Sequence, residues 1–294
     1  MREKEEESRV VKMTNFPSQG ANLRWEVPQR QIKHNDIIRA SDDQLKFLIK
    51  SVYDLLPTPA NKNRWFNTEE RCLLCGNNAT LAHILSGCKI ALSQGRYKWR
   101  HDKVLKEIAN AVQTKVNENA NKIENKKNRI QFVKEGQKVT KTNQDEENYS
   151  YLTAAKDWKV NVDVDTGLKI PTEICNTDLR PDLIMVSRKT KQLGIMELTV
   201  PNEDRIEVSG ELKRLKYEPI AQEGRKRGWR VRIWAVEVGC KGFPAVSMST
   251  FLKDIGYRGG NKKRVIEKIS KVAEEASKSL WKASHFKKWG GKEA

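Results

Sequence analysis

Two short apolar runs in the second half of the chain predict neighbouring strands. Residues 183–186 (Leu-Ile-Met-Val) and 195–200 (Ile-Met-Glu-Leu-Thr-Val) are too short for typical helices, and Pro201 ends the second run. A polar turn at residues 187–189 follows the first run. Strands that are joined by a tight polar connection usually pair antiparallel. We therefore expect these two segments to lie side by side in a sheet.

Further apolar patterns flank this pair. Residues 158–164 alternate between apolar and polar positions, which indicates a third strand, and residues 231–238 predict a fourth. Apolar residues at helical spacing predict helices over about 203–226 and 262–281. In the first of these helices the spaced residues are Val208, Leu212 and Leu215. The order strand, strand, strand, helix, strand is typical of an α/β fold, with a mixed sheet flanked by helices.

A capped helix is predicted before the strands. Ser41 and Gln44 resemble a capping box, in which the hydroxyl caps the helix and the amide reaches back to the cap. A stripe of apolar residues follows as far as Leu56, and Pro57 and Pro59 end the helix. We expect this helix to have a structural role.

Changes in polarity divide the chain. Residues 1–38 are polar, and we expect them to be disordered or loosely attached. Valine and isoleucine at helical spacing predict another helix over 104–116, and a segment rich in Asn, Lys, Gln and Glu follows as a linker. The predicted divisions are a loose N-terminus at 1–38, a helical zinc-binding module at 39–116, a linker at 117–149 and an α/β domain at 150–294.

The predicted zinc module contains four metal-ligand residues at close spacing. Two residues separate the first pair of cysteines, seven separate that pair from a histidine, and four follow before the last cysteine: Cys72, Cys75, His83 and Cys88. Three thiolates and one imidazole complete a tetrahedral Zn²⁺ site, which is structural because no coordination position stays open. The alternative is three buried cysteines and a core histidine.

Cations and aromatic residues alternate directly after this motif, at Arg96, Tyr97, Lys98, Trp99 and Arg100. Such a pattern suits phosphate contacts combined with base stacking, so the segment is a candidate nucleic-acid-binding site. The alternative is a helix start that packs on the zinc module.

Composition favours an anionic partner. The chain has 56 Lys and Arg against 38 Asp and Glu, which gives a net charge of +18. A balance this basic indicates nucleic acid, with DNA as the first candidate and RNA as the second. No apolar run approaches the length of a membrane span, and the N-terminus lacks the apolar core of a signal peptide. We therefore expect no membrane association, and five reduced cysteines in the cytosol or nucleus.

Two carboxylates in the α/β region are candidates for catalysis. Asp182 stands at the head of the first predicted strand, and Glu197 lies on the second, with fourteen residues between them. Mg²⁺ is usually held by one or two carboxylates together with water and substrate phosphate. On the following helix, Lys213 and Tyr217 are four residues apart and share one face. This set suits phosphodiester hydrolysis, whereas the alternative is a strand entry, a solvated glutamate and a surface helix.

These residues match a known motif. Arg180-Pro181-Asp182, Glu197-Leu-Thr and Lys213-x-x-x-Tyr217 resemble the restriction-like endonuclease of site-specific non-long-terminal-repeat retrotransposons, a variant of the PD-(D/E)xK nuclease superfamily. The Cys-Cys-His-Cys motif is similar to the one that precedes the endonuclease in the same proteins. The resemblance begins near Arg39 and covers most of the chain.

The resemblance implies roles for particular residues. Asp182 and Glu197 would hold a catalytic Mg²⁺, Lys213 would be the catalytic lysine with Lys216 as its substitute, and Tyr217 would support them. The usual superfamily lysine, two residues after the acid, is here Thr199. An upstream acid is also common in the superfamily, and Glu173 and Asp178 are the candidates for it. Asp163 and Asp165, near the first predicted strand, are candidates for metal binding, but we favour their interpretation as turn-flanking acids.

The expected function is therefore that of a nuclear, metal-dependent DNA endonuclease of retrotransposon origin. The chain resembles only the C-terminal portion of such proteins, because we find no Asp-Asp polymerase motif in a strand-turn-strand setting. Asn202 departs from the tryptophan that is common in the family. The alternatives are a non-cleaving module that binds DNA or RNA, and an inactive retrotransposon fragment.

Overall fold

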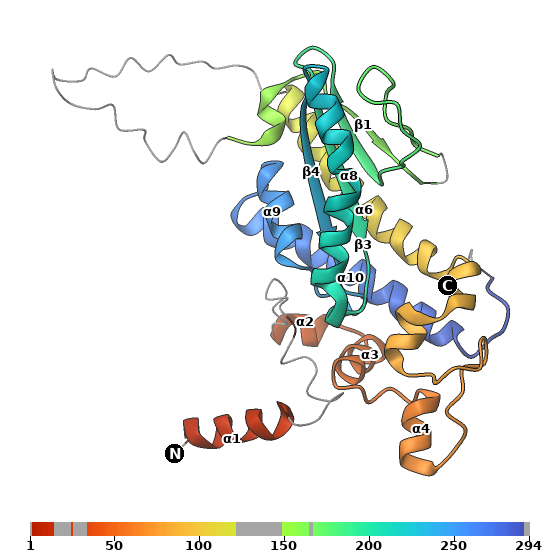
Figure 1. The fold of residues 1–294 in the computed structure, drawn as a ribbon. Coiled ribbons are helices and arrows are strands. Elements are labelled where there is room, and N and C mark those ends of the chain that lie inside the picture. Colours follow the sequence, from red (N-terminus) through yellow and green to blue (C-terminus); the bar gives the residue numbers. More distant parts are fainter. Residues whose placement is uncertain (1, 15–24, 26–33, 122–148, 165–166, 291–294) are drawn as a thin grey trace.

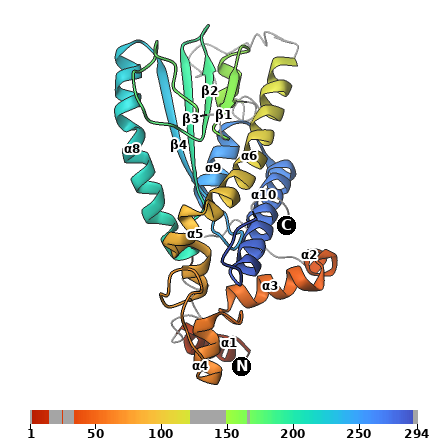
Figure 2. The ribbon, with the colours of Figure 1, turned by 90° about the vertical axis from the view of Figure 1, so that its right-hand side faces the viewer.

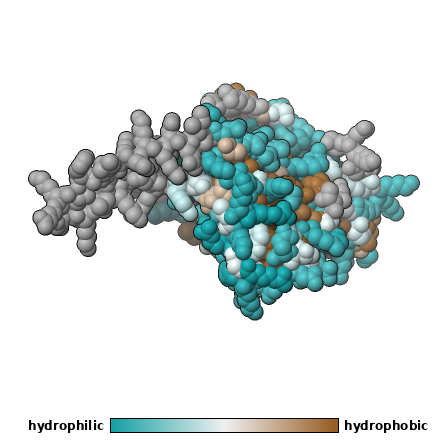
Figure 3. Space-filling view, turned by 90° about the horizontal axis from the view of Figure 1, so that it is seen from above, coloured by the Kyte–Doolittle hydropathy of each residue, from teal (hydrophilic) through white to brown (hydrophobic). Residues whose placement is uncertain are grey.

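The computed structural model shows a mixed sheet between layers of helices (Figure 1). Hydrophilic residues cover most of the face at the top of that view, with hydrophobic patches between them (Figure 3). The structure describes residues 2–14, 25, 34–121, 149–164 and 167–290.

Four strands form the sheet of the described residues, in the order β1-β2-β3-β4. The β1–β2 and β2–β3 pairs are antiparallel, and β3–β4 is parallel. This confirms the predicted mixed sheet and the predicted antiparallel pair. The two central strands are buried at every position except the last residue of β3, which explains their unbroken apolar sequences. The strands are β1 Lys159–Val162, β2 Leu183–Ser187, β3 Gln192–Thr199 and β4 Arg230–Glu237.

Helices cover both faces of the sheet (Figure 2). Helix α8 (Ile206–Lys226) connects β3 to β4 and packs on one face. The opposite face packs against α6 (Arg96–Asn121), α9 (Val246–Asp254) and α10 (Gly259–Ala283). The architecture is therefore a mixed α/β fold whose core has one layer on each side of the sheet.

Shorter elements complete the fold. Around the Cys/His motif lie several helices and a turn of π-helix, η2, and two 3-10 turns precede β1 and α8. Their bounds are α1 Arg2–Thr14, α2 His34–Arg39, α3 Asp42–Val52, α4 Pro59–Phe66, η2 His83–Gly87, α5 Lys89–Ser93, η3 Tyr151–Ala154 and η4 Glu203–Arg205.

The structure confirms one of the two hydrogen bonds of the capping box predicted at the start of α3. Ser41 Oγ accepts a hydrogen bond from the Gln44 backbone N–H, as in a capping box. The Gln44 side chain, however, donates to Glu274 on α10 instead of reaching back to Ser41. It therefore joins α3 to α10.

Helix α8 has the predicted position, but its apolar stripe faces outward. Val208, Leu212 and Leu215 are 63%, 64% and 73% exposed. The face against the sheet is formed by other residues of the helix, among them Tyr217 and Ile220. Helical spacing alone did not identify the buried face.

Helix α6 extends past residue 116, where we expected the zinc-binding module to end and the linker to begin. Residues 117–121 continue this helix, and Asn119 donates to the carbonyls of Leu152 and Ala155, at 2.8 Å each. Its apolar face packs in the same core as β2 and β3, so the helix assigned to the zinc module also covers the sheet. The rest of the predicted linker, 122–148, lies outside the described residues.

Parts of the N-terminal segment 1–38, which we expected to be disordered or loosely attached, form helices. Residues 2–14 form α1, and His34 begins α2. Trp25 stacks on Phe243 with ring centroids 5.5 Å apart, and its Nε1 donates to Asp204 at 2.8 Å. The remaining residues of this segment lie outside the described part.

Candidate catalytic and metal-binding sites

Asp182 and Glu197 lie side by side, as the strand pairing predicts. Asp182 directly precedes β2, and the register pairs Leu183 with Met196 on β3. The Asp182 N–H donates to Glu197 Oε2 at 3.2 Å, and the Leu198 N–H donates to Asp182 Oδ2 at 2.7 Å. The two carboxylates are therefore held by the backbone of the neighbouring strand.

One face of α8 brings basic and phenolic groups to this acid pair. Lys213 forms an ion pair with Glu197 Oε1, and Lys216 Nζ lies 3.4 Å from the same oxygen. Lys216 also donates to the Tyr217 hydroxyl at 3.0 Å, and that hydroxyl donates to the Arg180 carbonyl at 2.8 Å. Burial and the nearby charge of Glu197 raise the pKa of Tyr217 well above its usual value. Tyr217 is therefore a neutral structural support at neutral pH.

A histidine that the sequence did not single out for this site lies on the other side of the acid pair. His101, on α6, has its Nε2 3.2 Å from Asp182 Oδ2 and its Nδ1 3.1 Å from Asp102 Oδ1. Burial opposes the charged imidazole, but the hydrogen bonds to Asp102 and Asp182 outweigh it and raise the pKa of His101 to about 9. The separation of 81 residues from Asp182 hides this contact from sequence patterns.

The candidates for an upstream acid lie away from these contacts. Glu173 pairs with Arg188 on the surface at 2.8 Å, and Asp178 is exposed. Neither candidate has a contact with Asp182 or Glu197 in the described part of the chain. Asp102 of α6 reaches the acid pair through His101.

Asp163 forms one hydrogen bond through its side chain and one through its backbone. Its carboxylate accepts the Leu168 N–H at 3.0 Å, and its own N–H donates to the Asp182 carbonyl at 2.8 Å. This agrees with the interpretation of Asp163 as a turn-flanking acid. Asp165 lies outside the described residues.

The Cys/His motif forms a compact cluster. The ligand atoms of Cys72, Cys75, His83 and Cys88 all lie within 4.8 Å of one another, with Cys75 Sγ 3.2 Å from His83 Nε2. Gly76 takes a φ of +75°, the left-handed conformation that the turn after the first pair requires. Burial lowers the pKa of His83, which favours the neutral imidazole that binds metal. The donor set and its geometry fit a four-coordinate zinc ion.

The predicted nucleic-acid-binding segment is largely internal. Arg96 donates to the carbonyls of Ala283 and Phe286 at 2.7 and 2.9 Å, and Arg100 donates to those of Leu85 and Val200 at 2.9 Å each. Both arginines are 2% exposed. The expectation of phosphate contacts is therefore wrong for these two guanidinium groups.

The other three residues of that segment, 97–99, differ in exposure. Two of them pack inside the protein, as in the alternative interpretation, and one is on the surface. The Tyr97 hydroxyl donates to the His83 and Ile84 carbonyls, at 3.1 and 2.9 Å, which ties the helix to the zinc cluster. Trp99 packs edge-on against Trp289, with centroids 5.4 Å apart. Lys98 is exposed. Within 96–100, Lys98 is the residue that the surface exposes, and its Nζ lies 3.8 Å from Asp102 Oδ2, so a phosphate contact there stays a prediction.

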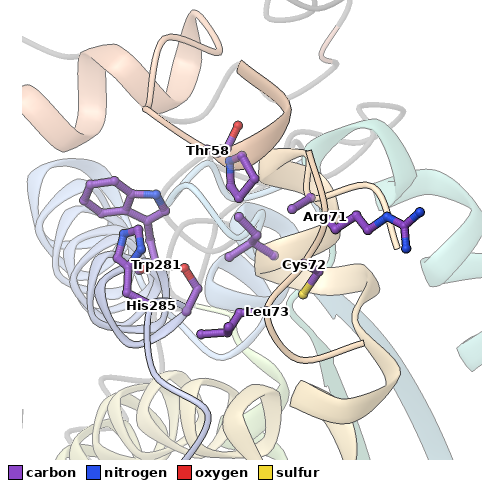
Figure 4. A pocket seen from close by; sticks show the side chains of 10 residues that line it. Thr58, Arg71, Cys72, Leu73, Trp281 and His285 are labelled. Atoms are coloured by element: carbon purple, nitrogen blue, oxygen red, sulfur yellow. Dashed lines mark hydrogen bonds between the residues drawn. The ribbon is translucent and has the colours of Figure 1, made fainter. Parts of the chain in front are cut away.

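A small pocket of about 120 Å³ lies between the Cys/His cluster and the end of α10. Figure 4 shows Trp281 and His285 on one side of it and Arg71 and Cys72 on the other. Apolar side chains such as Leu73 complete the lining. The pocket adjoins Cys72 of the Cys/His cluster, and no acid lines it.

Comparison of the chain with protein-family models and with curated proteins finds no match. No helix of the described residues has both the length and the apolar content to cross a membrane. None of the five cysteines, all of which are described, forms a disulfide. The fold and the site define a mixed α/β protein with a Cys₃His cluster that could hold zinc.

Proposed function

We propose that this protein is a metal-dependent DNA endonuclease that hydrolyses a phosphodiester bond. The observation that supports this most strongly is the convergence of Asp182, Glu197 and Lys213 at one end of the central strand pair. An acid at a strand head, a second acid on its neighbour and a lysine from the next helix are what the PD-(D/E)xK variant described above requires. The net charge of +18 favours an anionic substrate such as DNA, with RNA as a second candidate.

The carboxylates fit Mg²⁺ in their chemistry. Asp182 and Glu197 are hard oxygen donors, and Asp182 Oδ1 accepts no hydrogen bond from the described residues. When bound, the ion supplies a water of lowered pKa and stabilises negative charge on the phosphate. The ligands would be Asp182 and Glu197.

The protein's own groups then have defined tasks. Lys213, held at Glu197, lies where an ammonium group can orient the attacking water or neutralise a phosphate oxygen. The water oxygen bonds to phosphorus and its proton passes to solvent, while the bond from phosphorus to the leaving oxygen breaks and that oxygen takes up a proton from solvent. Tyr217 fixes the Arg180 carbonyl and so the entrance to β2. We further propose that the Cys/His cluster binds a structural zinc ion and that the protein acts in the nucleus, as a protein of retrotransposon origin would.

A second candidate function is non-cleaving recognition of nucleic acid. The observation in its favour is that Glu197, 3% exposed, has two lysines at one of its oxygens. A carboxylate neutralised in this way holds the fold together without any metal. An inactive retrotransposon fragment would give the same biochemical result.

Nicking of supercoiled plasmid distinguishes these functions. The wild-type protein should convert plasmid to the open circle with Mg²⁺ and not with EDTA, and Asp182→Ala should lose this activity. Asp178→Ala is the matched control, because it removes an exposed aspartate four residues away. DNA binding without nicking by the wild type would favour the second candidate.

A further inference from the structure

We infer that His101 is a positioning residue, which holds the Asp182 carboxylate so that its second oxygen is directed to a divalent cation. This inference deepens the proposed function and rests on it. It concerns a residue of α6, far in sequence from the acids and the lysine.

The hydrogen bonds of Asp182 are distributed unequally between its two oxygens. Oδ2 has two nitrogen partners, the Leu198 N–H at 2.7 Å and His101 Nε2 at 3.2 Å. Oδ1 has no hydrogen-bond donor among the described residues. Two donors on one oxygen fix the rotation of the carboxylate, and the other oxygen is left for a cation.

The imidazole is itself oriented. Asp102 Oδ1 lies 3.1 Å from Nδ1, so a carboxylate faces each ring nitrogen and Nε2 carries the proton toward Asp182. Lys98 Nζ, one turn earlier on α6, lies 3.8 Å from the other oxygen of Asp102. The result is a chain of contacts from Lys98 through Asp102 and His101 to Asp182.

The backbone under His101 is rigidly packed. Arg100 precedes it and donates to the Leu85 and Val200 carbonyls, and Val104 follows with no exposed surface. The side chains of His101, Asp102 and Asp182 are 24%, 15% and 17% exposed, so these contacts are not mobile surface ion pairs. Val200 belongs to the segment that follows β3, so the same helix turn also contacts the strand of Glu197.

Hydrogen bonds behind a metal ligand influence metal affinity, because they fix the geometry of the ligand. Loss of such a partner typically lowers affinity or activity by about 10- to 100-fold. A histidine that only stabilised the fold would leave the affinity for the cation unchanged once the protein was folded.

Mn²⁺ binding to the zinc-loaded protein, measured by calorimetry, tests this without relying on cleavage. Asp182→Asn identifies the heat that belongs to this site. We expect His101→Ala to weaken that Asp182-dependent binding by about tenfold or more. His101→Gln should recover most of the affinity, because its amide nitrogen reaches the place of Nε2 and still donates. His285→Ala, an exposed histidine on the far side of the zinc cluster, should bind as the wild type does.

The outcomes separate the inference from the function on which it rests. If Asp182→Asn loses Mn²⁺ binding while His101→Ala keeps wild-type affinity, the inference is overturned and the metal site stands. If the wild type has no Asp182-dependent binding, both are overturned. Thermal unfolding of each variant shows that it is folded. Should His101→Ala not fold, Asp102→Asn replaces it, with a smaller loss expected and unchanged affinity as the contrary result.

Discussion

Lys213 of α8 and Glu197 of β3 form an ion pair sixteen residues apart in sequence. Glu197 is 3% exposed, and the Lys213 side chain is 31% exposed, so the pair lies at the boundary between core and solvent. The contact joins the crossover helix to the strand that it leaves.

Replacing Lys213 should affect both stability and cleavage. Lys213→Met leaves Lys216, at 3.4 Å, as the one cation of the described residues at Glu197, and we expect a loss of about 1 kcal/mol in the free energy of unfolding, because the pair is partly exposed. Nicking should be abolished. Lys226→Met, at the exposed end of the same helix, is the control and should change neither. Urea denaturation and plasmid nicking measure the two effects, and unchanged nicking would remove Lys213 from the catalytic set.

Zinc content tests the Cys/His cluster. We expect one zinc ion per chain by elemental analysis after purification without chelator, and a large decrease in Cys72→Ser, because the cluster would lose one of its four ligands. Cys175→Ser is the matched control, since this buried thiol lies in the core on the α8 side of the sheet. Equal zinc in both variants would contradict the assignment.

Acidification should stabilise the folded protein through Glu237. Burial raises the pKa of this carboxyl, against hydrogen bonding from Ser247 and the charge of Arg214, and its Oε1 has no hydrogen-bond partner in the described part of the chain. A raised pKa in the folded state means that this group's contribution is greatest below its unfolded pKa and is lost as the pH rises through the folded value.

The free energy of unfolding of the wild type, relative to Glu237→Gln, should therefore increase as the pH falls from 7 to 4. Glu275→Gln, at an exposed position of α10, should show no such increase. Chemical denaturation at several pH values measures both differences. A flat difference for Glu237→Gln would show that its carboxyl titrates normally.

Arg100 and Lys98 should differ in their effect on stability. Arg100→Ala removes the donors for the Leu85 and Val200 carbonyls from a buried position, and we expect a loss of about 3 kcal/mol. Lys98→Ala, two residues earlier and exposed, should change stability by less than about 0.5 kcal/mol. Thermal denaturation compares them, and similar losses would mean that Arg100 is not the structural residue described here.

Much of the sheet could be predicted from the sequence, because buried central strands require continuous apolar runs and prolines mark their ends. The approach of Asp182 to Glu197 followed from that pairing. The compact Cys/His cluster followed from ligand spacing alone. In each case the interacting residues are close in sequence or joined by one short connection.

Contacts between distant segments could not be predicted. His101 meets Asp182 only because α6 packs across the sheet, which no local pattern encodes. Contacts with the end of α10, with η2 and with Val200 bury Arg96 and Arg100, whose alternation with aromatic residues suggested an exposed surface. The outward face of α8 is a further case: the apolar stripe has helical spacing, but the buried face is defined by Tyr217, Ile220 and small residues.

The central claim is that Asp182, Glu197 and Lys213 act together on a phosphodiester bond. Its most direct test is single-turnover cleavage of supercoiled DNA by the wild type and by Glu197→Gln, a variant of almost identical shape, with and without Mg²⁺. The predicted result is a Mg²⁺-dependent nick from the wild type and none from the variant. Equal nicking by both proteins, or none by a zinc-loaded and folded wild type, would contradict it.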